Sequence, residues 1–131
     1  MANAPASLQK GIETTQPLAS NAHIYCGDLV GWTLPDKYLI PASDTAGVYI
    51  IGTALEECDN TGGADGDLSC RVYEGGYRDM TTSGLTRADK RNTVYCLDAQ
   101  TATTKAGTTN KIGIGVLIAI DETNNIGTIK L

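Results

Sequence analysis

The sequence predicts an all-β fold, either a small barrel or a compact β-sandwich built from two similar halves, and three observations favour it. The 131 residues contain 15 Gly and no Phe, and Thr, Val, Ile and Tyr dominate the apolar runs. These residues suit strands because branching at Cβ restricts side-chain rotamers in a helix. Residues 67–74 alternate apolar and polar side chains, which is typical of a half-buried strand. Short apolar runs are separated by turn residues throughout.

Residues 1–20 are predicted to form a flexible N-terminal arm. Leu8, Ile12 and Leu18 are isolated apolar residues in this segment, and no sustained period connects them. Gly11 and Pro17 limit any helical turn. Such a segment cannot bury enough apolar area by itself to offset the entropy lost on ordering.

Residues 21–131 are predicted to form a single β domain. In its first half a polar loop at 59–66 precedes the last strand. The strands expected there are, in order, residues 23–26, 29–34, 37–40, 47–57 and 67–74.

A segment of low β character, residues 75–92, is expected between the two halves, and the second half follows it. Thr86 and Asp89 have capping-box spacing and predict one short helix there. Residues 98–110 are polar, Thr-rich and predicted to be a loop. The strands expected in this half are residues 93–97, 111–120 and 126–131.

Two half-repeats are predicted, at about 22–75 and 92–131. Residues 23–28 parallel 93–98, and residues 51–55 parallel 114–118. Both copies of the second stretch contain a glycine, Gly52 or Gly115, inside an apolar strand. A glycine in that position usually marks a bulge or a close approach of another backbone.

The charge and hydropathy of the chain argue against several classes of partner. The net charge is −5 and the pI about 4.6, which disfavours a nucleic-acid-binding surface. The longest apolar run, residues 112–120, is far shorter than the roughly 20 residues that cross a bilayer. No secretory signal is recognised at the start, so synthesis and retention in the cytoplasm are expected.

The residues that could carry chemistry are few, and no catalytic residue, metal or cofactor is predicted. Cys26, Cys58, Cys70 and Cys96 lack CxxC spacing, which disfavours zinc, and they are expected to be reduced thiols. The only histidine is His23, and no nucleophile motif accompanies it. The acidic loop 59–67 fails the spacing of a calcium-binding loop. A non-enzymatic protein is therefore expected.

Six short stretches of residues 25–131 form a pattern typical of one family. They are residues 26–30, 46–55, 65–72, 94–98, 114–118 and 127–131. With this pattern, residues 25–131 resemble the small tailed-phage capsid cement or head-decoration proteins. The resemblance implies a compact β domain on the capsid exterior of the virion. It would be bound to the major capsid protein, often as a trimer, and would stabilise the assembled head without catalytic residues.

The resemblance and the arm together predict that Leu8, Ile12 and Leu18 contact the capsid, since an extended segment can add a strand to a partner. The main alternative is a phage tail or head–tail component that self-assembles into a ring or tube. A hydrolase using His23 and a carbohydrate-binding module using Trp32 are weaker alternatives.

Overall fold

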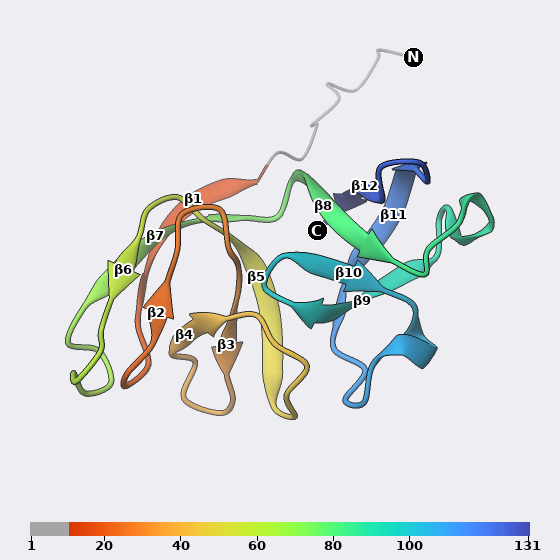
Figure 1. Ribbon diagram of the computed structural model, residues 1–131. Helices are drawn as coiled ribbons and strands as arrows, with labels where there is room; N and C mark the ends of the chain where they lie inside the picture. The colour runs from red at the N-terminus through yellow and green to blue at the C-terminus, as the bar shows by residue number, and fades with distance from the viewer. Residues whose placement is uncertain (1–10) are drawn as a thin grey trace, which may run out of the picture.

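A computed structural model, which describes residues 11–131, contains strands, turns and two short 3-10 helices, so the predicted all-β class is confirmed (Figure 1). No helix in this part of the chain is long and apolar enough to cross a membrane. The strands of the first half are β1 (Ile12–Pro17), β2 (His23–Ile24), β3 (Leu29–Thr33), β4 (Leu39–Pro41), β5 (Val48–Ala54), β6 (Cys58–Asp59) and β7 (Ser69–Glu74). Those of the second half are β8 (Tyr77–Ser83), β9 (Thr93–Asp98), β10 (Thr101–Thr103), β11 (Gly113–Asp121) and β12 (Ile126–Lys130).

The two halves have the same strand topology. In the first half the sheet order is β1-β7-β5-β3-β4, and an isolated parallel bridge between Leu18 and Leu39 connects its two ends. In the second half the order is β8-β12-β11-β9-β10, and β10 pairs in parallel with β8 to close the barrel. Each half is therefore a five-stranded barrel-like unit, and β2 and β6 form an additional two-stranded sheet beside the first.

The same irregularity occurs at the same place in both halves. In β5 the register with β3 shifts so that Ile51 is the extra residue, and in β11 the register with β9 shifts at Ile114. The next residue is Gly52 or Gly115. A Cβ atom on Gly52 would overlap the carbonyl oxygen of Tyr73, and one on Gly115 would overlap that of Lys130. Both glycines thus permit close approach of the neighbouring strand.

The strand register shows an internal repeat, but the predicted alignment of residues 23–28 with residues 93–98 is wrong. Val30 pairs with Gly52 and Val94 pairs with Gly115, so β3 is the counterpart of β9. The predicted match of residues 23–28 with 93–98 fails because β2 pairs with β6 instead. The predicted limits also change: β1 and β8 are the first strands of their halves, so the repeats start earlier than residues 22 and 92.

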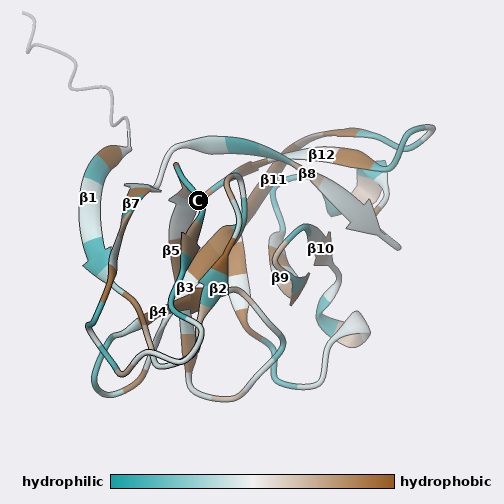
Figure 2. Ribbon diagram, turned by 60° about the vertical axis from the view of Figure 1, so that its left-hand side comes forward, coloured by the Kyte–Doolittle hydropathy of each residue, from teal (hydrophilic) through white to brown (hydrophobic). Residues whose placement is uncertain are grey.

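The N-terminal arm is shorter than predicted. Residues 12–17 form β1, which pairs antiparallel with β7 along its whole length. Leu18 follows with no exposed surface, and its amide donates to the carbonyl of Leu68 at 2.8 Å. The prediction of a flexible arm is wrong for residues 12–20, because strand pairing and burial stabilise this stretch. Figure 2 shows β1 as mostly polar, in contrast to β3.

Two further strands lie where loops were expected. β8 occupies the segment predicted to be least β-like, and β10 lies inside the predicted Thr-rich loop. The predicted short helix is present as a 3-10 helix, Arg87–Asp89, in which the Asp89 carboxylate accepts from the amide of Thr86 at 2.8 Å. A second 3-10 helix, Lys105–Gly107, was not predicted.

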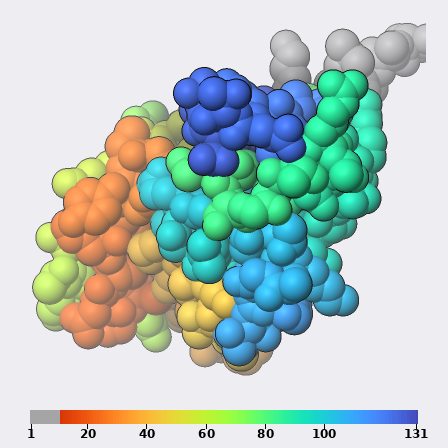
Figure 3. Space-filling model, turned by 45° about the vertical axis from the view of Figure 1, so that its right-hand side comes forward, coloured from red at the N-terminus to blue at the C-terminus, as the bar shows by residue number. Residues whose placement is uncertain are grey.

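Each half has its own apolar core, and the halves pack against each other (Figure 3). Leu29 and Ala42 come from the first half but belong to the core of the second. Between the halves, the amide of Leu29 donates to the carbonyl of Ala99 at 2.9 Å, and Gln100 Nε2 donates to Asp28 Oδ1 at 2.6 Å. The barrels are therefore joined by shared packing as well as by the chain.

Candidate functional site

Three exposed apolar side chains lie around the start of β1 and the connection from β7 to β8: Ile12, Tyr73 and Tyr77, which are 64%, 36% and 63% exposed. We call this group the Ile12 surface; Ile12 pairs with Glu74 and Tyr73 with Glu13, so Ile12 and Tyr73 project from opposite faces of the β1–β7 pair. The Tyr73 ring lies directly against the backbone of Gly11. The backbone of Gly76 is also close to this ring. Gly76 precedes Tyr77 in the connection from β7 to β8. The surface thus combines the start of β1 with the junction between the two barrels.

A hydrogen-bonded polar chain fills the end of the first barrel nearest this surface. Trp32 Nε1 donates to Gln16 Oε1 at 3.1 Å, and Gln16 Nε2 donates to Thr14 Oγ1 at 2.9 Å. Thr14 Oγ1 in turn donates to the carboxylate of Glu74. The polar groups of these side chains therefore form hydrogen bonds with one another, at an end of the barrel that apolar residues do not fill.

Most of the equivalent positions in the second barrel are apolar, although the counterpart of Thr14 is Arg78. By strand register, Gln16 corresponds to Met80, because each pairs with the matching position of β7 or β12. Trp32 likewise corresponds to Cys96. Met80 and Cys96 are buried in the second core. The topology therefore does not require the polar chain, which is a specific feature of the first barrel.

A second exposed apolar group lies around Trp32. Its ring stacks on Tyr49 with centroids 6.2 Å apart and planes at 21°, and Lys37 Nζ lies 5.4 Å from the ring centroid. Tyr49 is 59% exposed, whereas Trp32 is half-buried. Trp32 is thus engaged by two neighbours and by Gln16. It is not a free platform for a sugar ring, which weakens the carbohydrate-binding alternative.

The three residues predicted to contact a capsid have different surroundings. Ile12 is exposed on β1 and belongs to the Ile12 surface. Leu18 is fully buried in the first core, so the prediction that it contacts a partner is wrong. Leu8 lies outside the described residues. Tyr73 and Tyr77 were not singled out from the sequence: Tyr73 lies on the polar face of the alternating strand, and Tyr77 lies in a segment that was not predicted to be a strand.

His23 lies in an acidic, aromatic environment. Its ring stacks on Tyr25 with centroids 4.3 Å apart. Nε2 is 3.8 Å from the carboxylate of Glu57, and Nδ1 is 3.9 Å from that of Asp59. Within residues 11–131, His23 Nε2 has no hydrogen-bond partner.

The acidic loop after β6 uses its carboxylates to hold its own backbone. Asp59 accepts from the amide of Thr61 at 2.9 Å, and hydrogen bonds from Thr61 keep the pKa of Asp59 below its usual value. Asp67 accepts from the amide of Ala64 at 2.9 Å, and Asp65 from that of Ser20 at 2.8 Å. The contacts of Asp59 and Asp67 are local turns, whereas Asp65 holds the loop against the segment that follows β1.

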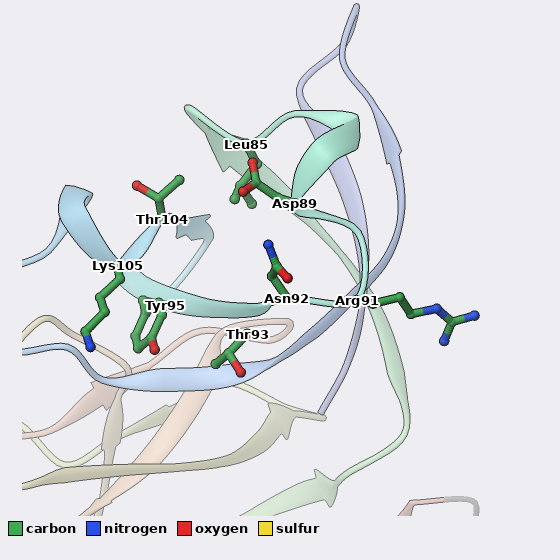
Figure 4. A pocket seen from close by; sticks show the side chains of 8 residues that line it. All are labelled: Leu85, Asp89, Arg91, Asn92, Thr93, Tyr95, Thr104 and Lys105. Atoms are coloured by element: carbon green, nitrogen blue, oxygen red, sulfur yellow. The ribbon is translucent and has the colours of Figure 1, made fainter.

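A shallow hollow of about 510 Å³ lies on the second barrel (Figure 4). Asp89, Asn92, Tyr95 and Lys105 are among its lining residues, and Arg91 points away from them in the view shown. The Asp89 carboxylate is already bound to Thr86. The hollow presents polar groups without a nucleophile and base in contact.

Three of the four cysteines are buried, and burial sets their chemistry. Cys58 and Cys70 lie in the first core. The half-buried Glu56 lies close to both of them. The spacing of these residues in the sequence does not match a local metal-binding motif. Desolvation raises the pKa of both thiols, and it raises the pKa of Cys96 in the second core to about 12. Cys26 is exposed.

Thiol labelling is expected to separate Cys26 from the other three cysteines. In the native protein at pH 8, an aromatic disulfide reagent should modify Cys26 quickly and the buried thiols only as the protein unfolds, because the thiolate is the reactive form. Mass spectrometry of timed samples checks this, with urea-unfolded protein giving four rapid modifications as the control. Rapid native labelling of Cys96 would contradict the described core.

Comparison of the chain with family models, with curated proteins and with solved structures found no match.

Proposed function

We propose that the protein is a capsid decoration protein, which binds the outer surface of an assembled phage head through the major capsid protein and stabilises it. The observation that carries the proposal is the exposure of Ile12, Tyr73 and Tyr77 around the start of β1 and the connection from β7 to β8. The resemblance of residues 25–131 to cement proteins supports the identity of the partner. In this proposal the chain has no catalytic role.

The chemistry of the Ile12 surface suits protein binding. Tyrosine is enriched at the centres of interfaces, since a rigid ring buries a large area and its hydroxyl retains a hydrogen bond. Tyr73 and Tyr77 supply two such rings, and Ile12 adds an aliphatic contact. A surface of three residues is small, so several copies are needed for tight attachment.

We further propose that a trimer provides those copies. Three equivalent surfaces around a three-fold axis of the shell would bind cooperatively, because the second and third contacts form at high effective concentration. The similar topology of the two barrels gives each subunit a broad, rigid body with which to bridge neighbouring shell subunits.

The double variant Ile12→Ser/Tyr77→Ser is expected to keep the fold but lose capsid binding. Both side chains are more than 60% exposed, so the melting temperature should change little. Binding to expanded, undecorated capsids should weaken at least about tenfold in co-sedimentation, which corresponds to about 1.4 kcal/mol. The wild-type protein should also increase the heat resistance of the capsids.

A matched control removes two exposed apolar side chains elsewhere. Leu97→Ser/Ile126→Ser lies on the second barrel and should bind capsids as the wild type does. Equal binding by both double variants would overturn the role of the Ile12 surface. Rings or tubes formed by the isolated protein would instead favour a tail or head–tail component.

A further inference from the structure

Three potential metal ligands converge beside the first core from separate parts of the chain. Cys58 is in β6, Cys70 is in β7, and Glu56 is in the turn after β5. Their sulfur and carboxylate atoms all lie within 4.8 Å of one another. Cys70 is fully buried and Cys58 is 9% exposed, so this is an interior site with one carboxylate at its rim.

We propose that Cys58, Cys70 and Glu56 bind a thiophilic divalent cation of the Zn²⁺ class. Two sulfurs and one carboxylate oxygen match the ligand types that zinc takes in proteins. With metal–sulfur bonds of about 2.3 Å and tetrahedral angles, ligand atoms are roughly 3.5–3.8 Å apart. The Cys58 sulfur already lies 3.6 Å from Glu56 Oε1, so small rotations of the side chains suffice.

Arg71 orients the carboxylate and balances its charge. Its Nε donates to Glu56 Oε2 at 3.0 Å, and its backbone amide donates to Glu56 Oε1 at 3.4 Å. Partners of this kind fix the position of a ligand and tune its metal. Two thiolates and one carboxylate with a divalent cation carry one net negative charge, which the Arg71 guanidinium offsets.

The cluster is not a requirement of the barrel. By register, the counterpart of Cys70 in the second barrel is Gly127, since Gln16 pairs with Cys70 and Met80 pairs with Gly127. Within residues 11–131, this is the one group of three metal-binding side chains found together. A disulfide between Cys58 and Cys70 would use the two sulfurs and would leave Glu56 paired with Arg71 alone.

Metal binding here involves no change of oxidation state. Each thiol loses its proton to solvent as the metal–sulfur bond forms, so two protons are released for each ion bound. Because protons and the metal compete for the same sulfur atoms, affinity should increase as pH rises.

Titration of the reduced full-length protein with Co²⁺ tests the proposal. We expect one equivalent to bind, with thiolate-to-cobalt absorption in the near ultraviolet and the visible bands of a tetrahedral site, and Zn²⁺ to displace it. Cys58→Ser and Cys70→Ser should each weaken binding by at least about 100-fold, and Glu56→Gln by at least about tenfold. Circular dichroism shows whether each variant has folded, and Glu56→Gln changes no core residue.

Cys96→Ser and Cys26→Ser are the matched controls, one buried and one exposed, and both should bind Co²⁺ as the wild type does. Absence of thiolate absorption in the reduced wild type would overturn the proposal. So would wild-type affinity in folded Cys58→Ser and Cys70→Ser. A Cys58–Cys70 disulfide in protein purified without reductant, with no metal binding after reduction, would assign the pair to redox chemistry instead.

Discussion

Replacing Leu18 with alanine is expected to lower the free energy of unfolding by about 2–5 kcal/mol. Leu18 has no exposed surface and packs in the first core. It also forms the parallel bridge to Leu39 that connects the two ends of the first sheet. Truncation therefore leaves a cavity at the point where β1 meets β4, where backbone on both sides prevents collapse.

Urea denaturation followed by circular dichroism measures this loss. Ile12→Ala is the control, because Ile12 lies on the same strand and is 64% exposed; its effect should stay within about 0.5 kcal/mol. Deletions give a second comparison. Removal of residues 1–10 leaves every described contact in place, whereas removal of residues 1–18 deletes β1 and exposes β7. Equal midpoints for the two deletions would show that β1 contributes nothing to stability.

The strands that the sequence predicted correctly are those with apolar side chains toward the core. β5 and β11 have long apolar runs, and β7 alternates cleanly, so periodicity identified them. β1, β8 and β10 were missed because their inward side chains are polar or small, for example Gln16, Thr82 and Ala102. Hydropathy cannot distinguish such strands from loops, and only their pairing partners identify them.

The internal repeat was recognised from glycines but misaligned from cysteines. Gly52 and Gly115 occupy equivalent positions because the backbone geometry there excludes any side chain. Cys26 and Cys96 resemble each other in sequence context, yet Cys26 is exposed beyond β2 and Cys96 is buried in β9. The two glycines, which close backbone approach requires, therefore identify the repeat better than the two cysteines do.

The candidate sites could be predicted only in part. Ile12 was identified as an isolated apolar residue, and the structure adds the exposed Tyr73 and Tyr77. The group of Glu56, Cys58 and Cys70 was not predicted as a metal site, because its members come from the turn after β5, from β6 and from β7, and no local spacing joins them. Sites assembled across strands depend on register, which the sequence alone left open.

Gly115→Ala is expected to be among the most destabilising single-methyl additions in the chain, at about 3 kcal/mol or more. The new Cβ would overlap the carbonyl oxygen of Lys130 in β12, with its carbonyl carbon and the Cα of Leu131 close behind. Backbone atoms of a paired strand cannot rotate away, so β11 and β12 must separate. Gly52→Ala should have a similar effect through Tyr73.

Gly113→Ala is the control on the same strand, because a Cβ there makes only ordinary contact with Thr93 Cγ2 at 3.7 Å. It should change the free energy of unfolding by less than about 1 kcal/mol. Urea denaturation should be followed by circular dichroism and by the fluorescence of Trp32, the only tryptophan, which lies in the first barrel. Because Leu29 and Ala42 pack into the second core, Gly115→Ala should shift both signals to the same lower midpoint. A shift in circular dichroism alone would show that the barrels unfold independently.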